Sequence, residues 1–175
     1  FGKGSKVSLF TLGTMRATES FDKMYNIIRS AYHVGINHIE TAAAYGDAEF
    51  HIGNALQKLE KEENISLNNW VITTKILPKG DLDFLKNNFE NSLKNLKLKK
   101  VNNLAIHGIN LNHYLDWARF GEGNKFISWI LQEGLADQVG FSSHGSYSLI
   151  KDAINSNIFS FCSLHLHYLD QSKIS

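Results

Sequence analysis

The sequence predicts an α/β protein whose strands run parallel in one sheet. Short apolar runs alternate with longer segments in which apolar residues recur at helical spacing, and this pattern repeats about every 30 residues. Alternation of strand and helix is typical of right-handed strand–helix–strand units, which place neighbouring strands parallel. Glycines stand where several predicted helices end, as expected of chain reversals. We therefore expect about six strands and about five helices.

In the first half of the chain, helical spacing of apolar residues separates the helices from the strands. Phe21, Met24 and Ile28 illustrate this spacing, and Asp47 and Asp81 stand where helix N-caps are expected. The predicted elements are a strand at 7–12, a helix at 21–34, a strand at 36–40, a helix at 47–63, a strand at 70–74 and a helix at 81–96.

The second half continues the alternation around one irregular stretch. Residues 108–123 contain no clear period, and we expect them to form a loop over a site, with Tyr114 and Trp117 as candidate walls. Ser146 or Ser148 is expected to begin the last helix. The predicted elements are a strand at 101–106, a helix at 126–131, a strand at 136–141, a helix ending near 154 and a strand at 159–168.

Length and composition indicate a single domain over residues 1–175. The chain has 175 residues, of which 43% are hydrophobic, and a net charge of +1. So small a charge gives no bulk attraction to nucleic acid, and no apolar run approaches the ~20 residues of a membrane span. Cys162 is the single cysteine, which excludes an internal disulfide framework. We expect no nucleic-acid or membrane partner and a cytoplasmic location.

Polar residues end several of the predicted strands. Glu40, Lys75, His107 and Ser142 each stand at the end of a different strand, and Tyr45 falls in the turn just beyond Glu40. The carboxyl ends of parallel strands meet on one side of a sheet or barrel, where active sites are found. These residues are therefore expected to share one site.

A phenol beside an ammonium group can act as a general acid. A neighbouring Lys75 would favour the phenolate of Tyr45, and Glu40 would keep that lysine charged and oriented. His107 could direct an N–H at the same oxygen. The group polarised between Tyr45 and His107 would most naturally be a carbonyl, because proton donation to its oxygen together with hydride arrival at its carbon is carbonyl reduction.

Each of these residues also has a purely structural interpretation. Glu40 and Lys75 could form an ion pair inside a core, and His107 could be a hydrogen-bonded structural histidine. His165 and His167 face one side of the last predicted strand, but no carboxylate ligand is indicated beside them, so no metal site is predicted.

At these positions the sequence resembles the aldo-keto reductase family. The family pattern is an acidic residue, Thr or Ser, Ala, two variable residues, Tyr and often Gly, and residues 40–46 read Glu-Thr-Ala-Ala-Ala-Tyr-Gly. Further family motifs are matched, in order along the chain, by Gly13-Thr14-Met15 in the first-strand turn, Thr73-Thr74-Lys75, Leu104-Ala105-Ile106-His107 and Val139-Gly140-Phe141-Ser142-Ser143.

The resemblance implies a (β/α)₈ TIM barrel, of which this chain supplies only about six strands. It implies NADP(H)-dependent reduction of a small-molecule aldehyde or ketone, with Tyr45 as general acid. The implied catalytic residues are Glu40, Tyr45, Lys75 and His107. The implied cofactor-binding residues are Gly13, Thr14, Met15, Ser142, Ser143 and Ser163.

The chain departs from the family pattern in three ways. Glu40 replaces the usual Asp, and Leu164, beside Ser163, stands where the family usually offers Gln. The aromatic residue of the seventh strand and the phosphate-binding loops after the seventh and eighth strands have no counterpart. We therefore expect a fragment with weak or no activity alone. Residues 107–110 and 140–145 look most like a branch whose longer members carry a C-terminal iron–sulfur domain.

Two alternative functions stay open at this point. A non-catalytic barrel that senses the cofactor or regulates a partner would keep the same fold, and Glu40 and Leu164 leave room for it. A doubly wound nucleotide-binding domain would fit the strand count. It is disfavoured because no GxGxxG follows the first predicted strand.

Overall fold

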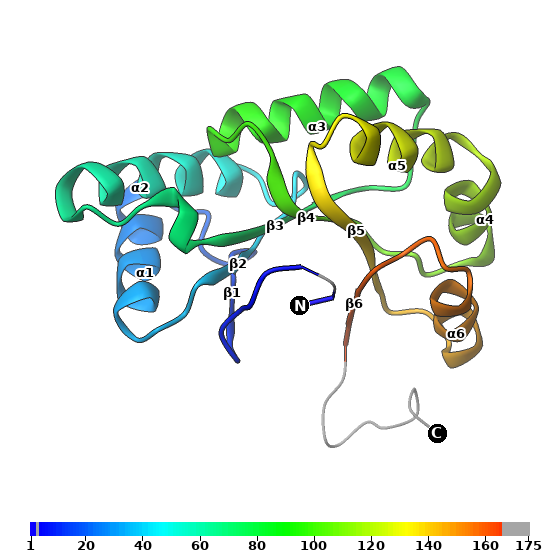
Figure 1. Cartoon of the computed structure of the whole chain (residues 1–175), viewed down its shortest axis with the longest axis horizontal. Coiled ribbons are helices and arrows are strands. Elements are labelled where there is room, and N and C mark those ends of the chain that lie inside the picture. The colour runs from blue at the N-terminus through cyan, green and yellow to red at the C-terminus, as the bar shows by residue number, and fades with distance from the viewer. Residues whose placement is uncertain (3, 166–175) are drawn as a thin grey trace.

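The computed structural model describes residues 1–2 and 4–165, and six parallel strands form one curved sheet in that part of the chain (Figure 1). The strands neighbour one another in chain order, from β1 to β6. Their bounds are β1 Thr11–Gly13, β2 His38–Glu40, β3 Val71–Ile76, β4 Val101–Ile106, β5 Ala136–Ser143 and β6 Cys162–Leu164.

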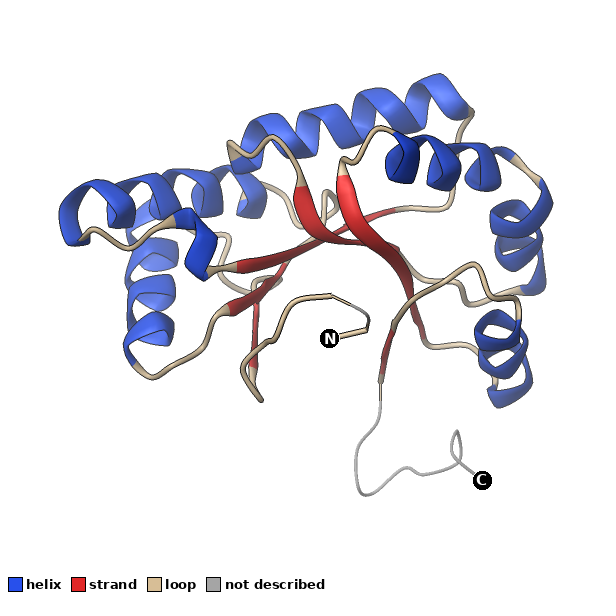
Figure 2. Cartoon of the chain, viewed as in Figure 1, coloured by secondary structure: helices blue, strands red, loops and turns tan. Residues whose placement is uncertain are grey.

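The helices cover the convex face of the sheet (Figure 2). They connect successive strands, so each strand–helix–strand unit repeats the same crossover. Their bounds are α1 Phe21–His33, α2 Ala48–Glu63, α3 Leu82–Leu96, α4 Asn112–Phe120, α5 Glu122–Gln132 and α6 Tyr147–Asn155, with a 3₁₀ turn η1 at Leu67–Asn69.

The strand order establishes the fold class. In a doubly wound sheet the order reverses at the point where nucleotides bind, whereas a barrel adds each strand beside the previous one. The sequential order and continuous curvature make this chain a half-barrel, a truncated form of the (β/α)₈ barrel (Figure 1). The barrel prediction is confirmed, and the doubly wound alternative is wrong.

The hydrophobic core lies between the sheet and its helices. Ile39 and Leu104 are fully buried, and behind them Phe89 of α3 meets Phe126 of α5 with ring centroids 6.2 Å apart. Burying aromatic side chains of this size contributes a large share of the folding free energy. The opposite, inner face of the sheet is left for polar side chains.

Serine and aspartate side chains begin three of the helices. Asp81 accepts a hydrogen bond from the Phe84 N–H at 2.9 Å, Ser20 begins α1 and Ser146 begins α6 in the same way. These side chains satisfy N–H groups that the first helical turn leaves without partners. Asp47 precedes α2 but makes no such bond.

Several predicted boundaries differ from the structure. The first strand, predicted at 7–12, is Thr11–Gly13, and the helix predicted at 126–131 extends over Glu122–Gln132. Residues 108–123 are not an irregular loop, because α4 occupies most of this stretch. Only Leu115 and Ala118 of α4 are buried, and two buried positions are too few to make a visible helical period. The last predicted strand, 159–168, is described only to residue 165, and β6 is its three-residue centre.

The N-terminal segment crosses the concave side of the sheet (Figure 1). The Phe1 ring lies 4.9 Å from the rings of both His38 and Phe161, measured between centroids. This segment therefore contacts a side chain of β2 and the residue just before β6. Within residues 1–2 and 4–165, no helix is long and apolar enough to cross a lipid bilayer.

Gly53 allows α2 to approach α3 closely, and this contact yields a stability prediction. A Cβ at position 53 would lie 2.3 Å from the Asn95 carbonyl oxygen. We expect Gly53→Ala to lower the free energy of unfolding by about 1–3 kcal/mol through overpacking, although alanine favours helices by about 1 kcal/mol. Urea denaturation measures the change. The exposed Lys61→Ala serves as control, and a Gly53→Ala variant as stable as this control would contradict the packing argument.

Candidate active site

The ammonium group of Lys75 is the centre of the candidate site. Lys75 lies within β3 rather than beyond it, and only 3% of its surface is exposed. Its Nζ lies 2.8 Å from Glu40 Oε1, 3.0 Å from the Thr41 carbonyl oxygen and 3.3 Å from the Tyr45 hydroxyl. A buried cation is stable only when charge and hydrogen bonds replace its water, and these three oxygens do so.

The backbone beyond β2 brings Tyr45 over this lysine. The N–H groups of Thr41 and Ala43 bond to the carbonyls of Thr73 and Lys75, so the chain stays paired with β3 past Glu40. It then turns, with the Tyr45 N–H donating to Ala42 at 3.0 Å. The Lys75 Nζ lies 4.9 Å from the Tyr45 ring centroid. The turn thus places a phenol and an ammonium in contact.

His107 completes the group from the end of β4. Its ring meets the Tyr45 ring edge to face, with centroids 5.7 Å apart at an angle of 87°. Its Nδ1 is buried and makes no hydrogen bond within the described part of the chain. Burial lowers the pKa of His107, the Lys75 charge lowers it further, and Glu40 opposes them. The imidazole is therefore neutral at pH 7.

The predicted serines lie beside this group, but their hydroxyl groups differ in the hydrogen bonds that they make. Ser142 and Ser163 pair in register across β5 and β6, and Ser163 Oγ donates to Glu40 Oε2 at 3.4 Å. Ser142 Oγ accepts from the Gly108 N–H at 3.0 Å. The Ser143 hydroxyl, in contrast, is bonded to backbone groups of residues 109 and 145, so it stabilises the loop after β5.

The first-strand turn contacts the site through the backbone of Glu40. Gly13 pairs with Glu40 in register, and both the N–H and the hydroxyl of Thr14 donate to the Glu40 carbonyl at 3.1 Å. Met15 is half exposed. Gly13 and Thr14 therefore flank the acidic residue.

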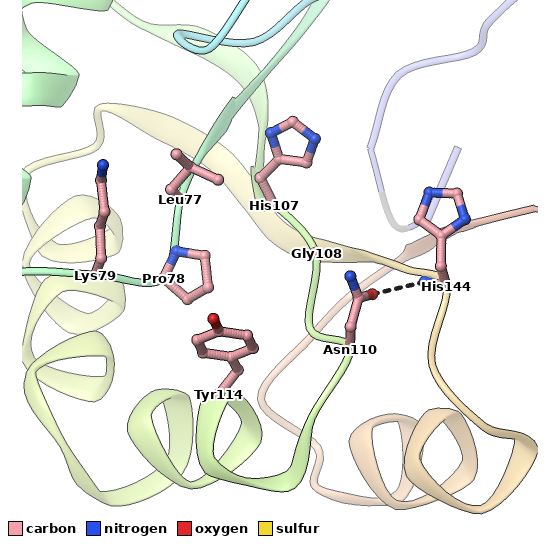
Figure 3. Close-up of a pocket in the computed structure, with 8 residues that line it drawn as sticks. All are labelled: Leu77, Pro78, Lys79, His107, Gly108, Asn110, Tyr114 and His144. Atoms are coloured by element: carbon pink, nitrogen blue, oxygen red, sulfur yellow. Dashed lines mark hydrogen bonds between the residues drawn. The ribbon is translucent and has the colours of Figure 1, made fainter.

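Two adjoining cavities open at this site. The smaller, of about 190 Å³, is lined by Glu40, Tyr45, Lys75, His107, Ser142, Ser143, His144, Ser163, Leu164 and His165. The larger, of about 420 Å³, is lined by Leu77, Pro78, Lys79, His107, Gly108, Asn110, Tyr114 and His144 (Figure 3). His107 and His144 line both cavities. A ligand in the larger cavity would therefore adjoin the Tyr45 and Lys75 groups.

Some of these neighbours were not visible in the sequence. The Thr41 carbonyl holds Lys75, and a backbone group has no residue-type signal. Pro78, the single proline, follows β3 and could have been recognised as part of a loop beside the site. Tyr114 lines the larger cavity as predicted, whereas Trp117 lies against Gly123 of α5. Here the expectation for Trp117 is wrong.

The described residues include no group of three or more histidine, cysteine, aspartate or glutamate side chains that could hold a metal ion. His167, one of the two histidines considered for metal binding, lies outside the described residues. The donor set at the site is instead hydroxyl, imidazole, ammonium and carboxylate, which suits an organic ligand with carbonyl and amide groups.

The charges around His107 predict the direction in which its pKa shifts when each charge is removed. Its pKa should lie below the ordinary histidine value of about 6.5. Lys75→Met removes a lowering charge and should raise the pKa, while Glu40→Gln removes an opposing charge and should lower it. NMR titration of the ring measures both shifts. Lys61→Met, at an exposed site, serves as control. Shifts of the same sign in both site variants would contradict the proposed arrangement.

Comparison with known proteins agrees with this geometry. The model of the Aldo/keto reductase family matches residues 10–173. Among solved structures, PA4992 of Pseudomonas aeruginosa, described provisionally as an aldo-keto reductase, superposes with a TM-score of 0.80 at 21% identity over 98% of this chain and 68% of its own. The AKR11C1 aldo-keto reductase of Bacillus halodurans, in its holo form, gives 0.78 at 20% identity over 94% and 56%.

A third structure carries the cofactor expected from the sequence. The Bombyx mori aldo-keto reductase AKR2E4, solved in complex with NADP, gives a TM-score of 0.73 at 22% identity over 93% of this chain and 55% of its own. The chain thus spans 55% to 68% of the length of these three structures. None of these three matches identifies the iron–sulfur branch, which stays a prediction. With the family match covering most of its length, the chain belongs to the aldo/keto reductase family.

Proposed function

We propose that the protein is an NADP(H)-dependent oxidoreductase that reduces an aldehyde or ketone to an alcohol. The observation that carries this proposal is the Lys75 ammonium, which joins the Glu40 carboxylate and the Tyr45 hydroxyl beside a neutral His107. A phenol beside a fixed cation is a suitable proton donor at neutral pH. Membership of the family and the shared fold support the same reaction class.

Each residue of this group has a role in proton transfer. Tyr45 donates its proton to the substrate carbonyl oxygen, and Lys75 stabilises the phenolate that remains. Glu40 neutralises Lys75 and fixes its position, with Glu40 Oε1 2.8 Å from Lys75 Nζ. The extra methylene of Glu relative to Asp therefore does not break the ion pair. His107, being neutral, can donate one N–H to the carbonyl oxygen and orient it.

The residues beside the group suit the nicotinamide end of NADP(H). Bound NADPH would supply the hydride that the carbonyl carbon receives. Ser142 and Ser163 line the smaller cavity on neighbouring strands and present hydroxyls that can bond a carboxamide. Gly13 and Thr14 would flank the ring from the first-strand turn. Ser143 would contribute through its position in the loop, since its hydroxyl is already bonded.

The larger cavity is the candidate site for the substrate. Its volume, about 420 Å³, suits a small organic molecule, and Leu77, Pro78 and Tyr114 give it an apolar wall (Figure 3). Asn110 is fixed by the His144 backbone N–H, which donates to it at 2.7 Å. A small carbonyl compound with an apolar or aromatic substituent fits these walls.

The test of this proposal is reduction of a panel of aldehydes, followed by NADPH absorbance. Because the chain spans only part of the matched structures, the assay includes the longest polypeptide that the gene encodes. We expect Tyr45→Phe to lower kcat by about 10²–10⁴-fold, since the proton donor is lost. Tyr25→Phe, at a hydroxyl bonded to Glu62 on the surface, is the control. Equal loss in both variants would show that Tyr45 is not the acid.

The 175-residue chain alone is expected to bind NADPH weakly. The described half-barrel offers contacts to the nicotinamide end, whereas the family resemblance places the phosphate-binding loops after the seventh and eighth strands. Quenching of tryptophan fluorescence measures the affinity. A dissociation constant in the low micromolar range for this chain would contradict the expectation. If the longer polypeptide also fails to bind, the regulatory, non-catalytic alternative takes its place.

A further inference from the structure

Polar side chains line the inner face of the sheet just below the candidate site. We define the polar row as His38, Thr73, Asn103 and Gln138, which lie on β2, β3, β4 and β5. Each is at most 4% exposed, and the last three pair directly in register. Barrel interiors are usually filled by bulky branched apolar side chains. A buried polar row in this position therefore requires partners for every polar atom.

Hydrogen bonds connect the polar row from end to end. Gln138 Nε2 donates to Asn103 Oδ1 at 2.7 Å, and Asn103 Nδ2 donates to Thr73 Oγ1 at 2.9 Å. His38 Nε2 lies 2.8 Å from Thr73 Oγ1, and His38 Nδ1 lies 2.8 Å from Thr11 Oγ1. Both ring nitrogens of His38 are thus engaged, one toward β3 and one toward β1.

The carbonyl oxygen of Phe1 fixes the direction of these bonds. A carbonyl can only accept, so Gln138 turns its amide nitrogen toward it, at 2.9 Å. The same nitrogen donates to Asn103, which in turn donates to Thr73. The single hydroxyl proton of Thr73 is then available to His38 Nε2, which lies 2.8 Å away. With Thr73 donating to Nε2, the ring proton of His38 sits on Nδ1, facing Thr11 Oγ1.

The same network opposes protonation of His38. A protonated ring carries N–H on both nitrogens, so the Thr73 proton would lose its acceptor. Burial lowers the pKa of His38, Glu40 opposes this, and Lys75 lowers it by a smaller amount. Glu40 on β2 and Lys75 on β3 are the charged side chains that act on the ring. Geometry and charge agree that His38 is neutral.

We propose that the polar row makes the neutral His38 a positioning residue for Glu40. The two residues share the inner face of β2, two positions apart. Hydrogen bonds on both edges of the ring hold β2 in one rotation about its axis, and that rotation decides where the Glu40 carboxylate meets Lys75. An uncharged ring also leaves Lys75 as the ion-pair partner of Glu40. The catalytic consequence rests on the proposed function, while the effect on Lys75 does not.

NMR of the histidine ring nitrogens in the 175-residue chain tests the state of His38. We expect the proton on Nδ1 and a ring pKa below the ordinary histidine value of about 6.5. His38→Gln assigns the resonances. A proton on Nε2, or titration near the ordinary value of about 6.5, would overturn the proposal.

Variants of Thr73 test the link to Lys75. Thr73→Val removes the hydroxyl and should change the His38 tautomer and move the Lys75 side-chain Cε resonance, whereas Thr73→Ser should restore both. Thr74→Val is the matched control, because Thr74 is also buried but bonds to Glu49 on the outer face. A Lys75 resonance that moves no more in Thr73→Val than in Thr74→Val would overturn the positioning role.

Two further measurements cover a Thr73→Val variant that does not fold and separate this proposal from the proposed function. If Thr73→Val does not fold, Thr11→Val removes the partner of Nδ1 at an exposed strand and should have the same effects. Hydride transfer is measured separately on the longest polypeptide. Its absence would refute the proposed function and leave the NMR result on His38 and Lys75 standing.

Discussion

The burial of one ammonium group, that of Lys75, constrains most of the candidate site. Removing a cation from water costs several kcal/mol unless opposite charge and hydrogen bonds replace the water. Glu40, the Thr41 carbonyl and Tyr45 supply the three oxygens, and all belong to the end of β2 and its following turn. The same requirement that stabilises the lysine therefore orders the turn that presents the phenol.

The half-barrel is sufficient to assemble this group because its members come from consecutive strands. Glu40 and Lys75 lie on β2 and β3, His107 directly follows β4, and α2, α3 and α5 lie behind these strands (Figure 1). Strand pairing, rather than closure of a full barrel, sets their spacing. The flanking residues come from β1 and the turn after it, from β5 and from β6.

Sequence reasoning worked where a residue type and a strand end coincide. Glu40, Lys75 and His107 were predicted to share a site because parallel strands place their carboxyl ends together, and the structure brings them together. It failed where the signal is weak or absent: α4 buries too few residues to show a period, and the Thr41 carbonyl carries no side-chain signal. The polar row was also missed, since isolated polar residues within strands give no sign that they are bonded to one another.

The proposed reaction is direct hydride transfer to a carbonyl at the Tyr45 and Lys75 group. The most direct measurement uses NADPH deuterated at the transferred position, an aldehyde substrate and the longest polypeptide of the gene, with the product examined by mass spectrometry. We predict an alcohol with one deuterium on the former carbonyl carbon, and loss of this product in Lys75→Met. Product formed without deuterium, or undiminished in Lys75→Met, would contradict it.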